Sequence, residues 1–343
     1  MLFYIVGSVF MKFGLFGSAK LTKIENDIDS SLNYNEWIDY NIEAEQLGFY
    51  STFTVEHHFT GMGQVSASLN LLTFLAAKTS KIKLGTAVLT LPWHNPVLIA
   101  EQVATMDLLS GGRIELGVGK GYRYNEFKGF NIDMEEASER FDESIDIMIK
   151  SWTNQERWSH HGKYWSFDDI IVEPTCNQKP YPSLWMAAGN HNSIQKVAER
   201  NANLLLDQFS PVTEVIKRVK IYKESLKKNN FKADTENRVA LARALYIAKD
   251  EKEKMEIIEK RMIARSKVDK LSERPDGQNK SSIMTFKGPD EALNGALIGT
   301  EEEINARLDI LKENGVGYIL LVDAGGGLKH LEKFAKSIMP NHI

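Results

Sequence analysis

The feature that most constrains the fold of this chain is a regular alternation of short apolar runs with longer amphipathic ones. The first pair is the strand-like run Lys12–Phe16 and the segment Tyr34–Leu47, whose apolar residues recur at helical spacing before Gly48. About eight such units follow one another, and each step between parallel strands has a helix to make the crossover. The alternation therefore predicts an α/β fold, a (β/α)8 or TIM barrel.

The remaining units can be assigned in the same way. The expected strands are Ser51–Val55, Ile82–Leu89, Arg113–Val118, Ser183–Ala188, Leu204–Asp207, Arg238–Ala248 and Gly317–Val322. The expected helices are Ser66–Lys78, Val97–Leu108, Met134–Trp152, Ser193–Arg200, Val212–Lys228, a long polar helix from Lys249, Glu301–Glu313 and Leu328–Ser337.

Two stretches interrupt the alternation, and we expect both to be long insertions at the carboxyl-terminal face of the barrel. Residues 153–182 are aromatic and contain prolines, and residues 267–297 are polar and rich in turn sequences. Loops this long inside a domain are usually functional. Residues 11–343 are predicted to form one domain. Residues 1–10 are apolar and precede a second Met, so we interpret them as a dispensable extension, too short to span a bilayer.

Composition narrows the class of protein. The net charge is −4 with the charges mixed along the chain, which does not favour a nucleic-acid partner. No segment has the length and apolarity of a transmembrane helix, so we expect no membrane partner. The single cysteine, Cys176, excludes an intrachain disulfide framework and suits the reducing cytoplasm, where we expect the protein to work.

Proton-transfer groups and glycines follow several predicted strands, at the face where barrels carry active sites. The second strand ends in Glu56-His57-His58-Phe59. The fourth is followed by Lys120 among three glycines, which let backbone approach a ligand closely, and the fifth by the helix start at Ser193. A phosphate between Lys120 and Ser193 would meet a cation, a hydroxyl group and amide donors.

Plainer interpretations of these residues stay open. A glycine-rich turn can simply close a strand, and Ser193 can simply cap its helix. A dinucleotide fingerprint is absent, because Tyr122 stands where its third glycine would be. Adjacent His57 and His58 lack the spacing of two metal ligands, so we expect no metal site. Cys176 has no identifiable paired base and is interpreted as a bystander.

In order along the chain, these groups resemble the bacterial luciferase-like flavin monooxygenase family. The similarity runs from about Met11 to Pro340 and is strongest over residues 52–133. The segments that carry it are Val55–Thr60, Lys81–Val88, Leu91-Pro92, His94–Val97, Asp107–Gly119, Phe127–Asp133 and Gly299–Gly315.

The resemblance implies a barrel that binds reduced FMN, or in some branches a deazaflavin, at its carboxyl face. His57 matches the catalytic histidine, and a neutral imidazole can move a proton at neutral pH. Ala87-Val88 matches a non-proline cis peptide under the isoalloxazine ring. Lys120 matches an arginine at the flavin phosphate, and the other cofactor-binding positions are Gly121, Gly189, Asn190 and Ser193.

The sequence also departs from the luciferase pattern. Gly119 stands in place of a reactive cysteine, and Gly189 in place of an acidic residue. Lys120 offers a point charge where the family has a bidentate guanidinium. We therefore expect flavin binding without bioluminescence.

By resemblance, the predicted activity is that of a monooxygenase that uses FMNH2 and O2. It would oxygenate a small organic substrate through a C4a-(hydro)peroxyflavin. The resemblance further implies a separate NAD(P)H-dependent flavin reductase that supplies FMNH2, and a homodimer. The alternatives are a deazaflavin-dependent hydride-transfer enzyme of the same fold, a non-catalytic flavin-binding protein and a metal-dependent barrel hydrolase.

Overall fold

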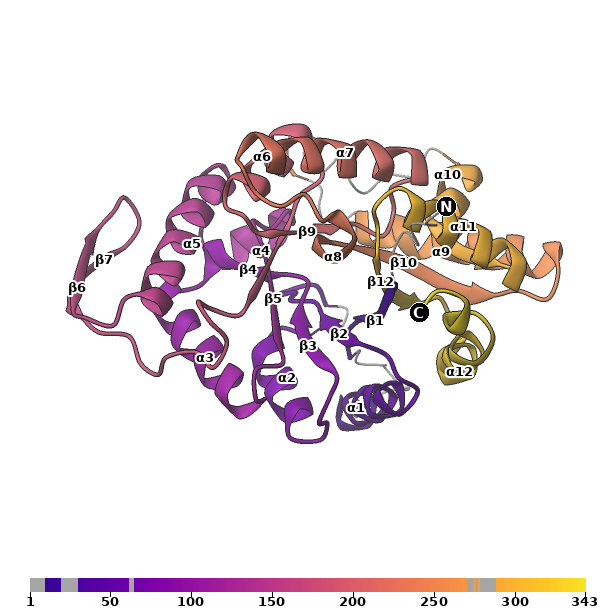
Figure 1. Cartoon of the computed structure of the whole chain (residues 1–343), viewed down its shortest axis with the longest axis horizontal. Coiled ribbons are helices and arrows are strands. Elements are labelled where there is room, and N and C mark those ends of the chain that lie inside the picture. The colour runs from indigo at the N-terminus through magenta and orange to yellow at the C-terminus, as the bar shows by residue number, and fades with distance from the viewer. Residues whose placement is uncertain (1–9, 20–29, 62–64, 270–273, 276, 278–287) are drawn as a thin grey trace, which may run out of the picture.

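The computed structural model describes residues 10–19, 30–61, 65–269, 274–275, 277 and 288–343, and its parallel strands close into a barrel (Figure 1). Each strand pairs in parallel with the next, β9 pairs with β10, and β12 pairs with β1 to complete the ring. The predicted fold class is confirmed. The barrel strands are β1 (Lys12–Gly17), β2 (Ser51–Thr54), β3 (Lys83–Thr86), β5 (Ile114–Gly119), β8 (Ser183–Ala187), β9 (Asn203–Leu206), β10 (Val239–Ile247) and β12 (Tyr318–Asp323).

A ring of helices surrounds the barrel, one after each strand (Figure 1). Several begin at side-chain caps that the sequence supplies. Asn95 accepts hydrogen bonds at the start of α3, and Thr300 and Glu303 form a capping box at the start of α11. The ring consists of α1 (Ser30–Gln46), α2 (Ser68–Ala76), α3 (Pro96–Leu109), α5 (Ala137–Thr153), α6 (His191–Glu199), α7 (Val212–Lys228), α11 (Glu301–Glu313) and α12 (Gly327–Ser337).

Three apolar clusters of described residues hold these layers together. The largest lies between the barrel and the helices, and a second fills the barrel around Phe53, Trp185 and Tyr318. The third lies around Ile257, Ile258 and Ile298, beside the end of β10. Neighbouring strands approach closely because glycine is present where a side chain would not fit. A Cβ atom on Gly117 would lie 1.8 Å from the carbonyl oxygen of Thr86 on β3.

The third predicted strand is interrupted. β3 ends at Thr86, and the chain continues through a cis peptide bond between Ala87 and Val88 into β4 (Leu89–Thr90). β4 then pairs with β5, Leu89 opposite Val118. The expectation of one continuous strand over 82–89 is wrong, and the cis peptide expected at Ala87-Val88 is confirmed.

The insertion 153–182 differs from its prediction. It contains a hairpin of β6 (Trp158–His161) and β7 (Ser166–Ile170) that projects outside the helix ring (Figure 1). Because it connects the end of α5 with the start of β8, it leaves from the amino-terminal face and not from the carboxyl-terminal face. Its aromatic residues pack along α5, where the Tyr164 hydroxyl donates to Glu139 at 2.8 Å.

Of the second predicted insertion, 267–297, residues 270–273, 276 and 278–287 lie outside the described residues. The described elements between β10 and α11 lie at the carboxyl-terminal face. They are α9 (Glu251–Asp269), α10 (Pro289–Asn294) and β11 (Ala296–Gly299), which extends the sheet beside the end of β10. Arg261 on α9 donates to the carbonyl of Gln208, just after β9, at 2.7 Å. Arg274 pairs at 2.9 Å with Glu135, which follows β5 in the chain. These described residues thus connect the ends of distant strands.

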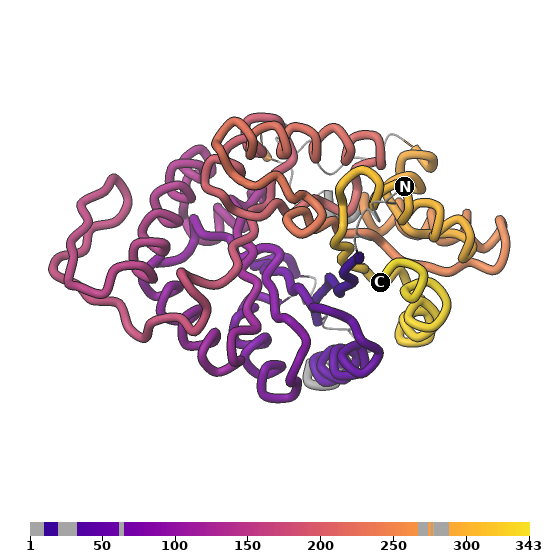
Figure 2. The backbone as a smooth tube through the Cα atoms, in the orientation of Figure 1, coloured from indigo at the N-terminus to yellow at the C-terminus, as the bar shows by residue number. Residues whose placement is uncertain are grey.

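The two ends of the described chain lie together. The Met11 amide donates to the His342 carbonyl at 2.9 Å, and Figure 2 shows β1 beside the C-terminal segment. Residues 1–9 lie outside the described residues, so the dispensability of 1–10 stays a prediction.

None of the helices in the described part of the chain is both long and apolar enough to cross a membrane. The shorter elements are η1 (Leu91–Trp93), α4 (Tyr124–Gly129), η2 (Met134–Glu136), α8 (Thr235–Arg238) and η4 (Met339–Asn341).

Candidate functional site

A buried carboxylate, Glu56, organises the segment after β2. Its Oε1 accepts hydrogen bonds from His58 Nε2 at 2.9 Å and from His94 Nε2 at 2.6 Å. Its Oε2 accepts one from the Thr90 amide at 2.7 Å. Burial raises the pKa of Glu56, but the hydrogen bonds from His58 and His94 outweigh burial and hold the pKa below its usual value. Glu56 is therefore an ionised anchor between the segments that follow β2 and β4.

His57 faces a second buried carboxylate, Glu126 of α4. The Nδ1 atom of His57 lies 3.0 Å from Glu126 Oε1, and the same oxygen accepts the His58 amide at 2.9 Å. Burial lowers the pKa of His57, while the hydrogen bond to Glu126 opposes this only in part. The pKa stays below its ordinary 6.5, so the imidazole is neutral at neutral pH. Of its two ring nitrogens, Nδ1 is the one that contacts this carboxylate.

His58 has a supporting position. Besides its bond to Glu56, its ring packs edge-on against Trp93 and Phe130, with centroids 5.5 and 4.8 Å away. Phe59 continues this aromatic cluster in a left-handed conformation, with φ of 55°. Gly129 makes room for it, because a Cβ there would lie 2.3 Å from the Phe59 ring. These contacts give His58 a packing and supporting role.

An apolar floor lies at the carboxyl end of the barrel interior. Ala87 and Val88, together with Phe16 and Val322, pack on the inner core and remain partly exposed. Gly119 leaves room for the Val88 side chain, because a Cβ at position 119 would lie 2.5 Å from Val88 Cγ2. Such a surface suits a flat aromatic ring system, which is apolar on its faces.

Lys120 and the start of α6 lie at the ends of neighbouring strands, β5 and β8. The Nζ of Lys120 donates to Ser138 Oγ, in the first turn of α5, at 3.1 Å. Burial lowers the pKa of Lys120, the nearby charge of Lys196 adds to this effect, and the Asp142 carboxylate opposes it. Lys196 lies in the last turn of α6 and pairs with Asp142 at 2.8 Å, so Lys120 is the cation that an anion at the α6 start would meet.

The start of α6 has the residues that the sequence indicated. Asn190 Oδ1 accepts the Ser193 amide at 2.9 Å, and Ser193 Oγ accepts the Asn190 amide at 3.3 Å. Gly189 precedes this capping box. Gly121, beside Lys120, has a φ of 78°, which favours glycine. The structure thus brings these residues to one region, while the capping role that remained open for Ser193 is also present.

At the start of α12, which follows β12, a carboxylate of the chain itself accepts the backbone amides. Barrels often hold phosphate near their last strands. Here Asp323 Oδ1 accepts the amides of Gly325, Gly326 and Gly327 at 3.1, 2.9 and 2.9 Å. A carboxylate already occupies the start of α12, so the α6 start beside Lys120 is the better anion site.

Sequence reasoning missed three residues of this site: Glu126, His94 and Ser138. Glu126 lies 69 positions from His57, and no spacing pattern connects them. His94 lies in a segment that was identified for its resemblance alone, and nothing in its position marks it as a partner of Glu56. The weak signal available was that each follows a barrel strand, as active-site residues do.

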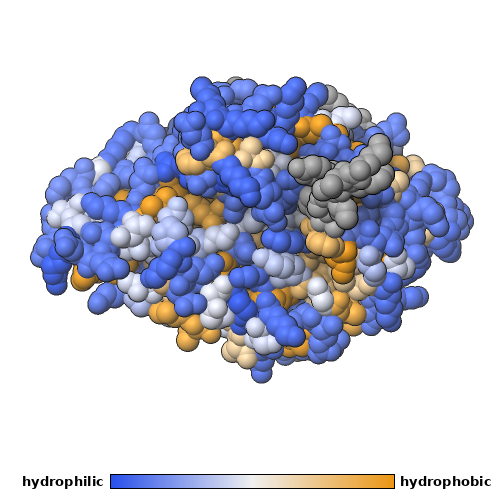
Figure 3. Space-filling view, in the orientation of Figure 1, coloured by the Kyte–Doolittle hydropathy of each residue, from blue (hydrophilic) through white to orange (hydrophobic). Residues whose placement is uncertain are grey.

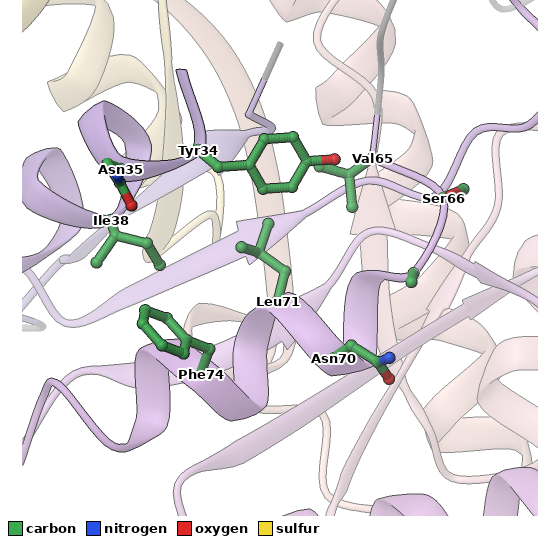
Figure 4. A pocket seen from close by; sticks show the side chains of 9 residues that line it. Tyr34, Asn35, Ile38, Val65, Ser66, Asn70, Leu71 and Phe74 are labelled. Atoms are coloured by element: carbon green, nitrogen blue, oxygen red, sulfur yellow. The ribbon is translucent and has the colours of Figure 1, made fainter. Parts of the chain in front are cut away.

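Two other features lie apart from this site. Burial raises the pKa of Cys176 to about 12, so it carries no thiolate. An outer groove of about 320 Å³ lies between α1 and α2, lined by Tyr34, Leu71, Phe74 and neighbours (Figure 4). Within the described ranges, no three His, Cys, Asp or Glu side chains are grouped to hold a metal ion.

Comparison with known proteins gives the family. The sequence profile of the luciferase-like monooxygenases matches residues 11–317. An uncharacterised protein of Sinorhizobium fredii is 29% identical over 74% of this chain and 71% of its own length. An FMNH2-dependent dimethylsulfone monooxygenase of Pseudomonas putida is 25% identical over 94% of this chain and 92% of its own. Some other matches span only about half of the relative's length.

Solved structures agree with this assignment. The monooxygenase RslO1 of Streptomyces bottropensis superimposes with a TM-score of 0.81 at 25% identity, covering 97% of this chain and all of that one. An F420-dependent secondary alcohol dehydrogenase shares the fold, with a TM-score of 0.78 at 15% identity, over 96% of this chain and 98% of its own. Since the family profile matches most of the sequence, the chain belongs to the luciferase-like monooxygenase family.

Proposed function

We propose that this protein is a monooxygenase that uses reduced FMN and O2 to oxygenate a small organic substrate. One oxygen atom would enter the substrate and the other would leave as water, with FMNH2 giving the two electrons. The observation that carries the proposal is the combination, at one barrel face, of the partly exposed Ala87-Val88 floor with a neutral, oriented His57. The FMNH2-dependent relative supports the choice of cofactor.

The chain's own residues would divide the work as follows. Lys120, Ser138 and the α6 start would bind the phosphate. Ala87 and Val88 would support the isoalloxazine ring, and His57 Nε2 would accept a proton and return it. Bound FMNH2 would supply the electrons that activate O2. The aromatic cluster of His58, Phe59, Trp93 and Phe130 would help to exclude water.

The test is the variant His57→Ala, in which we expect unchanged FMN affinity and loss of oxygenation. Affinity is measured by calorimetry. Turnover is measured as O2 consumption and product formation with photoreduced FMN, across aldehydes, ketones, alkanes and sulfones. His161→Ala, an exposed histidine on the outer hairpin, is the matched control. Full product yield from His57→Ala would remove His57 from the mechanism.

A deazaflavin-dependent hydride-transfer enzyme is the second candidate, supported by the shared fold of the F420-dependent alcohol dehydrogenase. Parallel titrations with reduced FMN and with a reduced deazaflavin distinguish the two candidate functions. We expect the monooxygenase to bind reduced FMN more tightly than the deazaflavin. A protein that binds FMN but consumes no O2 with any substrate would instead be a non-catalytic flavin carrier.

Two partners and a location accompany this proposal. A separate NAD(P)H-dependent flavin reductase would supply FMNH2, in a reducing cytoplasm that suits the lone Cys176. A homodimer would cover the exposed apolar side chains of α2 and α3, where Phe74, Leu98 and Leu109 are 53%, 54% and 67% exposed. Figure 3 shows apolar surface along the lower side of the molecule, where Figure 1 places α2 and α3. Light scattering of Leu98→Glu tests the dimer, with Ile263→Glu on α9 as control.

A further inference from the structure

We infer that Glu126 is the positioning residue of His57: its carboxylate keeps the imidazole proton on Nδ1 and leaves Nε2 as the proton acceptor. This inference rests on the proposed function, in which His57 moves a proton. It adds to that function a residue that touches neither flavin nor substrate and acts through the histidine.

The geometry fixes both the proton and the ring. Glu126 Oε1 lies 3.0 Å from His57 Nδ1 and accepts the amide of the next residue, His58, at 2.9 Å. Because an ionised carboxylate only accepts hydrogen bonds, the proton of a neutral His57 must lie on Nδ1. The His57 amide in turn donates to the Val65 carbonyl at 2.9 Å. The backbone on both sides of the ring is therefore held, and the ring has one orientation.

The charges around His57 are consistent with this role. Glu126 is 1% exposed, and Arg123 Nη1 lies 3.9 Å from its Oε1, so a cation partly balances the buried carboxylate. Glu56 approaches from the end of β2, and the Tyr122 ring lies edge-on to the imidazole at 6.4 Å. Burial and Arg123 lower the pKa of His57, whereas Glu126 and Glu56 raise it. Removal of the Glu126 charge should therefore lower this pKa further.

The chain offers a matched control in a second glutamate–histidine pair. Glu143 Oε1 lies 3.1 Å from His160 Nε2, where the outer hairpin packs on α5. This pair has a similar distance and a similar carboxylate, but it lies outside the barrel. Glu143→Gln thus removes one charge from a Glu–His pair without a change at the carboxyl face.

The experiment follows the His57 ring nitrogens by ¹⁵N NMR in protein labelled at histidine, without flavin. Wild type should show a protonated Nδ1 and an unprotonated Nε2. In Glu126→Ala we expect a mixture of tautomers. In Glu126→Gln, whose amide oxygen still accepts from Nδ1, we expect the tautomer to persist while His57 titrates at lower pH. Glu126→Asp should restore part of the wild-type behaviour, and Glu143→Gln should change nothing at His57.

Activity gives the second readout. Glu126→Ala should lower kcat about 10- to 100-fold with FMN affinity nearly unchanged. The magnitude is taken by analogy from the loss of a group that orients a metal-bound histidine. The acidic limb of the pH–rate profile should move to lower pH in Glu126→Gln. Unchanged ¹⁵N signals and titration of His57 in all three Glu126 variants, each shown by thermal unfolding to be folded, would overturn the inference. Changed signals with unchanged turnover would support the positioning role and contradict instead the catalytic role of His57.

Discussion

His94 Nε2 lies 2.6 Å from Glu56 Oε1, and this contact joins the segment after β2 to the segment after β4. The same oxygen also accepts from His58. With the Thr90 amide on Oε2, three donors converge on one buried carboxylate next to the proposed base. The first prediction concerns the contribution of this carboxylate to stability.

Glu56→Gln should lower the free energy of unfolding by about 2–4 kcal/mol. An amide has one acceptor oxygen, so either the Thr90 amide or the two histidines would face its NH2 group. Urea unfolding of the flavin-free protein measures the loss. Glu139→Gln, at an exposed ion pair with Lys163, should cost much less. Equal losses in the two variants would contradict the role of Glu56 as an anchor.

The proposed phosphate site makes a prediction that depends on the ligand. Lys120→Ala should weaken FMN binding by about 1.5–3 kcal/mol, roughly 10- to 100-fold, because a charge-assisted contact is lost. Riboflavin, which lacks the phosphate, should bind both proteins equally. Calorimetry with each ligand measures this, and Lys163→Ala on the outer hairpin is the control. A parallel loss of riboflavin affinity would show that Lys120 supports the fold rather than the phosphate.

The turn beside Lys120 should tolerate only glycine. Gly121→Ala places a Cβ in the left-handed region at φ 78°, 2.8 Å from Thr90 Cγ2. We expect a loss of about 1–2 kcal/mol of stability together with weaker FMN binding. Gly17→Ala, where no atom lies within 4 Å of the added Cβ, should be nearly neutral in thermal unfolding. If both variants melt with the wild type, the turn is less constrained than its geometry implies.

The sequence predicted those parts of the fold that local periodicity controls. Helix Val212–Lys228 begins and ends where its apolar spacing and its lysine-rich last turn indicate. The stretch 153–182 was predicted at the wrong face of the barrel, because its aromatic residues gave no sign of their partner. That partner is the outer surface of α5, through Glu139 and Glu143. Packing of this kind depends on residues distant in the chain, which no window of sequence reports.

The residues of the candidate site likewise fall into two groups, those that the sequence identified and those that only the structure revealed. His57 and Lys120 follow strands and match a family signature, so both were identified before any contact was known. Glu126 and Ser138 are ordinary polar residues in helical turns, and only the barrel brings them to His57 and Lys120. A first layer of residues could therefore be predicted from position along strands, whereas the partners that orient it required coordinates.

The last prediction concerns pH. Burial lowers the pKa of His57, His330 and His342 below the ordinary 6.5, against opposing carboxylates at Glu126, Asp323 and Asp309. Below about pH 6.5 the unfolded chain binds protons that the folded protein does not, so protonation favours unfolding. Stability should fall as the pH decreases from 7, by at most about 1.4 kcal/mol per pH unit for each of the three groups, and should level off below their folded pKa values.

Glu56 should add a second acid-sensitive window for the opposite reason. Its folded pKa is lowered from 4.5, so its contribution is fully present above that value and is lost as the pH falls through the folded pKa. Urea unfolding from pH 7 to 3 should resolve the two windows. His342→Gln should flatten only the upper one, because it keeps the backbone bond to Met11 and lies away from Glu56. A wild-type curve that is flat between pH 7 and 5 would show that these histidines titrate alike in the folded and unfolded protein, which would contradict the lowered pKa of His57.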